Sequence, residues 1–226
     1  MIRHRIIGTP DNTERALTKC LTRSDPNDVL NTWIIENMPS VLDLGCGYPK
    51  DLQLLNHKFG LENLVGVDKR TEKEILGHTT TPPITELTSL YEGYNRHQTI
   101  NPGYRISNKY NEVVYNAIIK DKILFETTIG KYFANNPEKS FGIIIVSNVL
   151  QFLPFEVFER TLSLIGKVLS PGGKFYIRIQ NNSGSIPWTG NVSKIDRALD
   201  RCSLVGDTIR INKKGRFHCM EFTNIF

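Results

Sequence analysis

A short segment that combines acidic residues with two glycines is the strongest candidate for chemistry in this chain of 226 residues. Asp43 is followed by Gly45-Cys46-Gly47, and Asp68 comes 21 residues after Gly47. Glycine allows a tight turn and lets a ligand approach the main chain. A carboxylate about 20 residues beyond such a turn can accept hydrogen bonds from the hydroxyls of a ribose. These residues predict a site for a nucleoside cofactor.

The alternative of an ordinary NAD site is weakened by one position. The dinucleotide fingerprint is G-x-G-x-x-G, and the place of its third glycine is taken here by Lys50. Because two glycines alone are weak evidence, the elements around them carry much of the interpretation.

Those elements are predicted by the spacing of apolar residues. Val41, Leu42 and Leu44 form a short apolar run that is typical of a buried strand. A helical pattern begins near Lys50, and a second apolar run ends at Asp68. The sequence thus predicts a strand, a glycine turn, a helix and a second strand. In this arrangement the first N–H groups of the helix point into the ligand crevice.

The rest of the chain continues the alternation of strands and helices. Apolar runs predict strands within residues 122–127, 142–146, 174–180, 208–212 and 217–222, and helical spacing predicts helices over residues 12–23, after residue 27, and over residues 154–169 and 192–202. The strand over 142–146 is continuously apolar, as a central parallel strand should be.

At these residues the chain resembles the class I S-adenosylmethionine-dependent methyltransferases. The family's first motif, an acidic residue followed by G-x-G, is matched by Asp43, Gly45 and Gly47. Residues 141–153 are similar to the family's fourth strand and the loop after it, and residues 168–177 to the helix, turn and strand that bring in the fifth. The resemblance covers roughly residues 27–70 and 122–226.

The resemblance implies an α/β fold, a Rossmann-like three-layer sandwich. Its sheet is expected to hold seven strands, mostly parallel, with an antiparallel last strand and an insertion after the second strand. We expect a single methyltransferase domain over residues 1–226, with N-terminal helices in residues 1–38. The helix over residues 12–23 either lies across the cofactor as a lid or packs on the edge of the sheet.

Residues 69–121 form the insertion, because one crossover helix and two short loops would need far fewer positions. Five of the eight tyrosines fall within it. Long segments in compact domains tend to be functional or disordered, and aromatic residues favour order. We interpret the segment as a cap that binds the methyl acceptor or forms an oligomer, while a plain insertion packed on a helix face is the alternative.

The resemblance also implies how the first motif and Asp68 would bind S-adenosyl-L-methionine. Gly45, Cys46 and Gly47 form the turn against which the methionine portion lies. Asp43 orders that turn or meets the amino group through water, and Asp68 accepts hydrogen bonds from the ribose hydroxyls.

Adenine recognition departs from the family pattern, in which an Asp or Glu near the end of the third strand bonds the adenine amino group. Thr128 stands in that place, and the backbone N–H of Ile129 would bond a ring nitrogen. Glu126 is the nearest carboxylate if the register shifts by two residues, which would keep it on the same strand face. After the fourth strand, Ser147, Asn148 and Gln151 are placed to meet cofactor or acceptor.

No catalytic residue is assigned. Methyl transfer from a sulfonium has a neutral leaving group, so positioning and desolvation can supply most of the rate. A general base could assist an oxygen or nitrogen acceptor, but none of the five histidines lies in a motif that identifies it.

The expected function is in-line methyl transfer to a small-molecule acceptor. Two alternatives remain open: an RNA or protein methyltransferase that uses the basic surface, since the net charge is +5, and a catalytically silent cofactor-binding subunit. The family's signature for amino methylation of bases, a strand-end Asn or Asp followed by two prolines and an aromatic residue, is missing after Ser147-Asn148.

Composition limits the remaining classes. The four cysteines are scattered and form no C-x-x-C pair, so neither a metal site nor a disulfide framework is indicated. The N-terminus is basic without a sustained apolar stretch, and no later run approaches the length of a membrane span. We expect a cytoplasmic protein that does not enter a membrane, and no feature indicates its oligomeric state.

Overall fold

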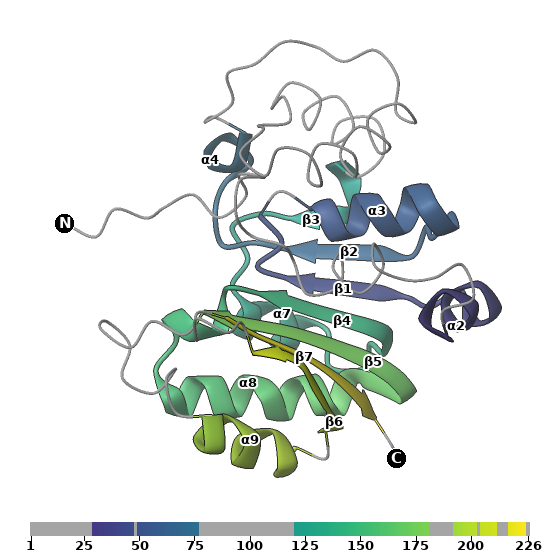
Figure 1. The fold of residues 1–226 in the computed structure, drawn as a ribbon. Helices are drawn as coiled ribbons and strands as arrows, with labels where there is room; N and C mark the ends of the chain where they lie inside the picture. Colours follow the sequence, from purple (N-terminus) through teal and green to yellow (C-terminus); the bar gives the residue numbers. More distant parts are fainter. Residues whose placement is uncertain are drawn as a thin grey trace, which may run out of the picture.

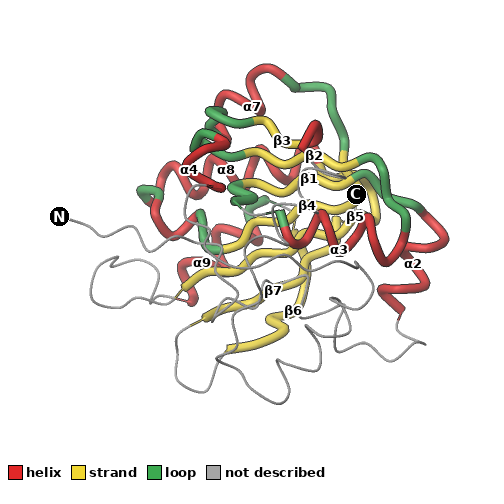
Figure 2. Tube along the Cα trace, turned by 90° about the horizontal axis from the view of Figure 1, so that it is seen from above, coloured by secondary structure: helices red, strands yellow, loops and turns green. Residues whose placement is uncertain are grey.

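A computed structural model describes residues 29–47, 49–76, 120–180, 192–202, 204–211 and 217–224 of the chain. Within these ranges one seven-stranded sheet has the strand order β3-β2-β1-β4-β5-β7-β6 (Figures 1 and 2). The strands are β1 (Val41–Leu44), β2 (Leu64–Val67), β3 (Ile123–Leu124), β4 (Phe141–Ser147), β5 (Leu169–Gln180), β6 (Leu204–Ile211) and β7 (Phe217–Asn224).

Parallel pairing joins five neighbouring strands, from β3 through β2, β1 and β4 to β5. Strand β7 is antiparallel to both β5 and β6, which it separates. This arrangement confirms the expected α/β, Rossmann-like class. The parallel strands require crossover connections, which is why helices alternate with them along the chain.

The helices cover the sheet on both faces. They are α2 (Val29–Asn37), α3 (Lys50–Phe59), α4 (Glu72–Leu76), α7 (Ile129–Asn135), α8 (Phe155–Val168) and α9 (Val192–Asp200), with short 3₁₀ helices η2 (Lys120–Lys122) and η3 (Leu150–Phe152). Helices α7, α8 and α9 share one buried apolar cluster with the sheet, and α2 and α3 share another. The described molecule is therefore a three-layer sandwich (Figure 1).

The apolar positions of the helices explain which face they bury. In α8, Phe158, Leu162 and Ile165 are buried and recur at intervals of three and four residues, the spacing of one helix face. In α2, Leu30 and Ile34 are buried, and Trp33 packs against the same cluster. These contacts agree with the helices predicted after residue 27 and over residues 154–169.

The third strand lies within its predicted range but is limited to Ile123 and Leu124, because the chain turns at the next residues. Two predicted strand starts were wrong. The sixth strand begins at Leu204 rather than Thr208, since Leu204 already pairs with Asn224. The fifth strand begins at Leu169 rather than Lys174, since Leu169 already pairs with Phe141. The Pro-Gly-Gly turn lies inside this strand as an irregularity of the β4–β5 register.

Several predicted segments lie outside the described residues. They include the helix over residues 12–23, residues 77–119 of the insertion, and the loop over residues 181–190. The part of the insertion that the structure describes contains α4 and ends within η2.

Candidate active site

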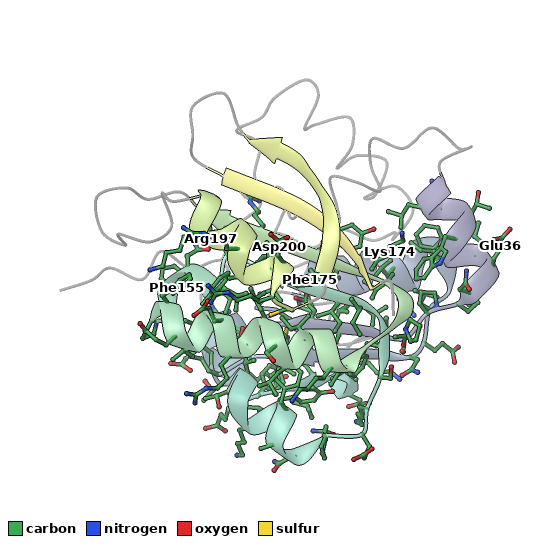
Figure 3. All side chains as sticks on the ribbon, turned by 90° about the horizontal axis from the view of Figure 1, so that it is seen from below. Glu36, Phe155, Lys174, Phe175, Arg197 and Asp200 are labelled. Atoms are coloured by element: carbon green, nitrogen blue, oxygen red, sulfur yellow. The ribbon has the colours of Figure 1, made fainter. Side chains whose placement is uncertain are left out.

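The predicted site residues lie at the carboxyl ends of the parallel strands. Helix α2 leads into the amino end of β1, whereas Phe155 begins α8 shortly after the carboxyl end of β4. Glu36 on α2 and Phe155 lie at opposite ends of the molecule (Figure 3). The crevice at the carboxyl edge is the place where ligands bind in open α/β sheets.

The glycine turn is bonded directly to the second strand. The N–H groups of Gly45 and Cys46 both donate to the carbonyl oxygen of Val67, at 2.7 and 3.1 Å. Gly45 and Gly47 have φ angles of +70° and +51°, which favour glycine. The Cys46 side chain is fully buried in the apolar cluster of α2 and α3, so only its main chain can face a ligand.

Gly45 has a packing role that the sequence did not indicate. A Cβ placed on Gly45 would lie 2.3 Å from Cγ2 of Val149. The space beside this glycine is therefore occupied by the chain that follows β4 rather than left open. This contact brings the segment after β4 directly against the turn after β1.

Asp68 follows β2 and ties the site together. It is only 4% exposed, and its Oδ2 accepts the N–H of Gly47 at 2.8 Å. Its Oδ1 accepts the backbone N–H and the Nε of Arg70, both at 2.9 Å, while Nη2 of Arg70 donates to Oδ2 at 2.9 Å. The structure therefore brings Asp68 together with the glycine turn, as the sequence predicted.

The surroundings of Asp68 keep it ionised. Burial by itself would raise the pKa of this carboxyl group. The hydrogen bonds from the side chain and backbone of Arg70, the positive charge of Arg70 and the N–H of Gly47 together outweigh burial and hold the pKa below its ordinary value.

Arg70 is the site residue that sequence reasoning missed. A signal was present, because an Asp side chain commonly accepts the backbone N–H two residues further on, in an Asx-turn. The observed bond from Arg70 N to Asp68 Oδ1 has this form. The same turn brings the guanidinium group back onto the carboxylate.

Asp43 lies in β1, two residues before the glycine turn begins at Gly45. It is fully buried in the middle of the sheet, between Gly66 of β2 and Ile145 of β4. Strand alternation puts it on the face covered by α2 and α3, with Val41. Its position next to the turn fits the predicted role of ordering it.

Thr128 is exposed and caps helix α7. Its Oγ1 accepts the N–H of Lys131 at 3.2 Å. A hydroxyl that accepts a cap bond can still donate its own hydrogen. Ile129 is the first residue of α7 and is partly buried against the core. The suggestion that Glu126 shares a strand face with this position was wrong, because β3 ends before it and Glu126 has a φ of +52°.

The end of β4 supplies a buried polar group on each of two consecutive residues. Ser147 and Asn148 are 5% and 3% exposed. Neither Oγ of Ser147 nor Oδ1 of Asn148 has a hydrogen-bond partner among the residues that the structure describes. Asn148 has a φ of +57°, and its N–H donates to the carbonyl oxygen of Arg178 at 2.9 Å.

The described residues contain no group of three His, Cys, Asp or Glu side chains that could hold a metal ion. No helix among them has the length and apolarity to cross a membrane.

Known proteins were compared with the chain as a whole. A family model described as a methyltransferase domain matches residues 2–208. No curated protein is similar enough in sequence to match.

Solved structures with a similar fold have low sequence identity to the chain. A TehB-like SAM-dependent methyltransferase from Corynebacterium glutamicum is 16% identical, with a TM-score of 0.51 over 88% of this chain and 90% of that one. The N-methyltransferase NodS from Bradyrhizobium japonicum is 15% identical, with a TM-score of 0.50 over 86% and 91%. Magnesium protoporphyrin IX methyltransferase from Synechocystis, crystallised with bound SAM, is 14% identical, with a TM-score of 0.50 over 86% and 76%. Because the family model covers most of its length and the fold agrees, the chain belongs to the methyltransferase-domain family and is a class I S-adenosylmethionine-dependent methyltransferase.

Proposed function

We propose that this methyltransferase transfers the methyl group of S-adenosylmethionine in line to a small-molecule acceptor. The cofactor would lie over the glycine turn and Asp68, and the acceptor would enter beside Ser147 and Asn148. The observation that carries this proposal is the pair of buried polar groups at the end of β4.

Buried polar groups normally have hydrogen-bond partners, since leaving one unsatisfied costs about 1–3 kcal/mol. Ser147 Oγ and Asn148 Oδ1 have none among the described residues. Their segment also packs against the glycine turn, because Val149 fills the space beside Gly45. A ligand that lies along the carboxyl edge of the sheet, next to the turn and to the end of β4, could satisfy both groups, so these residues fit a bound cofactor and acceptor.

The glycine turn, Asp43 and Asp68 would make or support the other contacts with the cofactor. Asp68 accepts hydrogen bonds from the ribose hydroxyls, and the main chain of Gly45, Cys46 and Gly47 supports the methionine portion. Asp43 orders the turn from beneath.

On the adenine side, we propose that Thr128 donates its hydroxyl hydrogen to the ring and that the N–H of Ile129 bonds a ring nitrogen. The capping bond from Lys131 leaves that hydrogen available. We also propose that Ser147 contacts the cofactor near its sulfur atom.

When bound, the cofactor supplies an activated methyl group and a neutral leaving thioether. The chain's residues then have to hold the acceptor in line and exclude water. The Oδ1 atom of Asn148 can accept a hydrogen bond but does not take up a proton, so it can orient an N–H or O–H group of the acceptor without acting as a base. We therefore assign positioning, rather than proton removal, to the end of β4.

The small-molecule acceptor is supported by the chain after β4. The segment Val149-Leu150 packs into the interior, with Leu150 fully buried, in place of the two prolines that follow a strand-end Asn or Asp in base-amino methyltransferases. The net charge of +5 leaves an RNA acceptor as the alternative to test.

Two measurements test the proposal. Calorimetry with S-adenosylhomocysteine should show binding to the wild-type protein and at least tenfold weaker binding to a folded Asp68→Ala variant. Methyl transfer from labelled cofactor should then be detected with a pool of small metabolites but not with total RNA or protein at physiological salt. Cofactor binding without transfer to any pool would favour a silent subunit, and transfer to RNA with a steep salt dependence would overturn the small-molecule acceptor.

A further inference from the structure

The carboxylate that we assign to the ribose already has its acceptor positions filled. An ionised carboxylate offers about four lone-pair sites. Asp68 receives four hydrogen bonds, from Gly47 N, Arg70 N, Arg70 Nε and Arg70 Nη2. Ribose hydroxyls that donate to Asp68 must therefore replace one or more of these bonds.

The two backbone bonds are fixed by the surrounding fold. The N–H of Gly47 belongs to the glycine turn, which is bonded to Val67. The turn from Asp68 to Arg70 is held as well. The carbonyl oxygen of Arg70 accepts the N–H of Glu126, and the N–H of Asp68 donates to the carbonyl oxygen of Leu124. Moving the Gly47 donor would disturb the bonds between the glycine turn and β2, and moving the Arg70 donor would disturb the bonds between the ends of β2 and β3.

The guanidinium group is the movable partner. The Arg70 side chain is 26% exposed, whereas Asp68 is 4% exposed. A partly exposed arginine can leave a carboxylate by rotating its side chain into solvent, where water hydrates the guanidinium group. The bonds from Nε and Nη2 are thus the ones that a ribose can replace.

We propose that Arg70 competes with the cofactor ribose for Asp68, so that cofactor binding requires the guanidinium group to leave one or both carboxylate oxygens. Arg70 would then lower the affinity for the cofactor without itself contacting the cofactor. The inference rests on the proposed assignment of Asp68 to the ribose.

The test compares Arg70→Met with Lys69→Met by calorimetry at neutral pH. Methionine keeps most of the length of the arginine stem and removes the guanidinium group. Lys69 is the neighbouring exposed cation, so its replacement controls for the lost charge. Arg70→Met should bind S-adenosylhomocysteine about three- to tenfold more tightly than the wild type, while Lys69→Met should not change the affinity.

A second ligand tests whether the higher affinity of Arg70→Met depends on the ribose hydroxyls. The 2′,3′-dideoxy analogue of S-adenosylhomocysteine lacks the competing hydroxyls, so Arg70→Met should bind it no more tightly than the wild type does. Unchanged or weaker binding of S-adenosylhomocysteine by a folded Arg70→Met protein would overturn the competition. If Asp68→Ala bound S-adenosylhomocysteine as tightly as the wild type does, the assignment of Asp68 to the ribose would be wrong instead.

Discussion

At the scale of single residues, Gly45 is required by a contact within the protein. It has a φ of +70°, and its missing Cβ makes room for Val149. The close approach of two loops at the carboxyl edge is thus a reason for glycine in this motif that is independent of the proposed ligand.

Replacing Gly45 by alanine should therefore cost more than backbone strain. Gly172 is a matched control, because its φ is +69° and no atom lies within 4 Å of its Cβ position. Gly172→Ala should lower the free energy of unfolding by about 1 kcal/mol. Gly45→Ala should lower it by about 1–3 kcal/mol more, through overpacking against Val149. Urea denaturation measures both, and equal losses would show that the contact with Val149 is harmless.

Asp68 should make the stability of the fold depend on pH. Its pKa is lower in the folded protein than its ordinary value, so its ionised form stabilises the fold above that ordinary value. This contribution is lost as the pH falls through the folded pKa. The stability difference between the wild type and Asp68→Asn should therefore be largest at neutral pH and shrink on acidification. Unfolding by urea across an acidic pH series measures it, and a difference that grew toward acid pH would contradict the sign.

At the scale of elements, helix α7 links the sheet to the predicted adenine contacts. The helix begins where Thr128 accepts the N–H of Lys131, and Tyr132 and Phe133 bury its inner face. The N-cap therefore sets where the first turn lies. Thr128 would serve both helix and cofactor with one hydroxyl group.

Thr128→Val should remove both the helix cap and the proposed adenine contact while leaving packing unchanged, because valine has a similar shape without the hydroxyl. Loss of the N-cap should lower the free energy of unfolding by about 1 kcal/mol, whereas Thr128→Ser should keep most of it. Thermal or urea unfolding gives the stability. Calorimetry on the folded Thr128→Val protein should also show weaker S-adenosylhomocysteine binding, and unchanged affinity would remove Thr128 from the adenine site.

At the scale of the whole molecule, the site lies between elements that are distant in sequence. The turn after β1, Asp68 after β2, and the residues after β4 meet only because β1 lies between β2 and β4 in the sheet. A ligand held by all three segments binds only the folded state. It should stabilise the entire domain rather than one loop.

Thermal unfolding measures this linkage. At a concentration of S-adenosylhomocysteine about 100 times its dissociation constant, the free energy of unfolding should rise by about 2.7 kcal/mol. For a domain of this size the midpoint should then rise by roughly 5–10 °C. Asp68→Ala should abolish most of the shift at the same ligand concentration. A full shift in that variant would show that Asp68 does not hold the cofactor.

The sequence by itself determined the order of elements and the acidic and glycine residues of the site. Short-range patterns are enough for this, because strand runs, helical spacing and glycine turns depend on neighbouring residues. The first two strands, helix α3 and the position of Asp68 follow from such patterns. Strand ends were less predictable, because β3 and β5 end or begin where pairing with a neighbouring strand allows it.

The tertiary structure alone decided how the site residues are used. It showed that Val149 occupies the space at Gly45 and that Thr128 caps a helix. It also showed that Arg70 lies on the carboxylate of Asp68. The physical reason is that hydrogen bonds and packing join groups that are close in space, and spacing along a chain does not reveal which donor reaches a given acceptor.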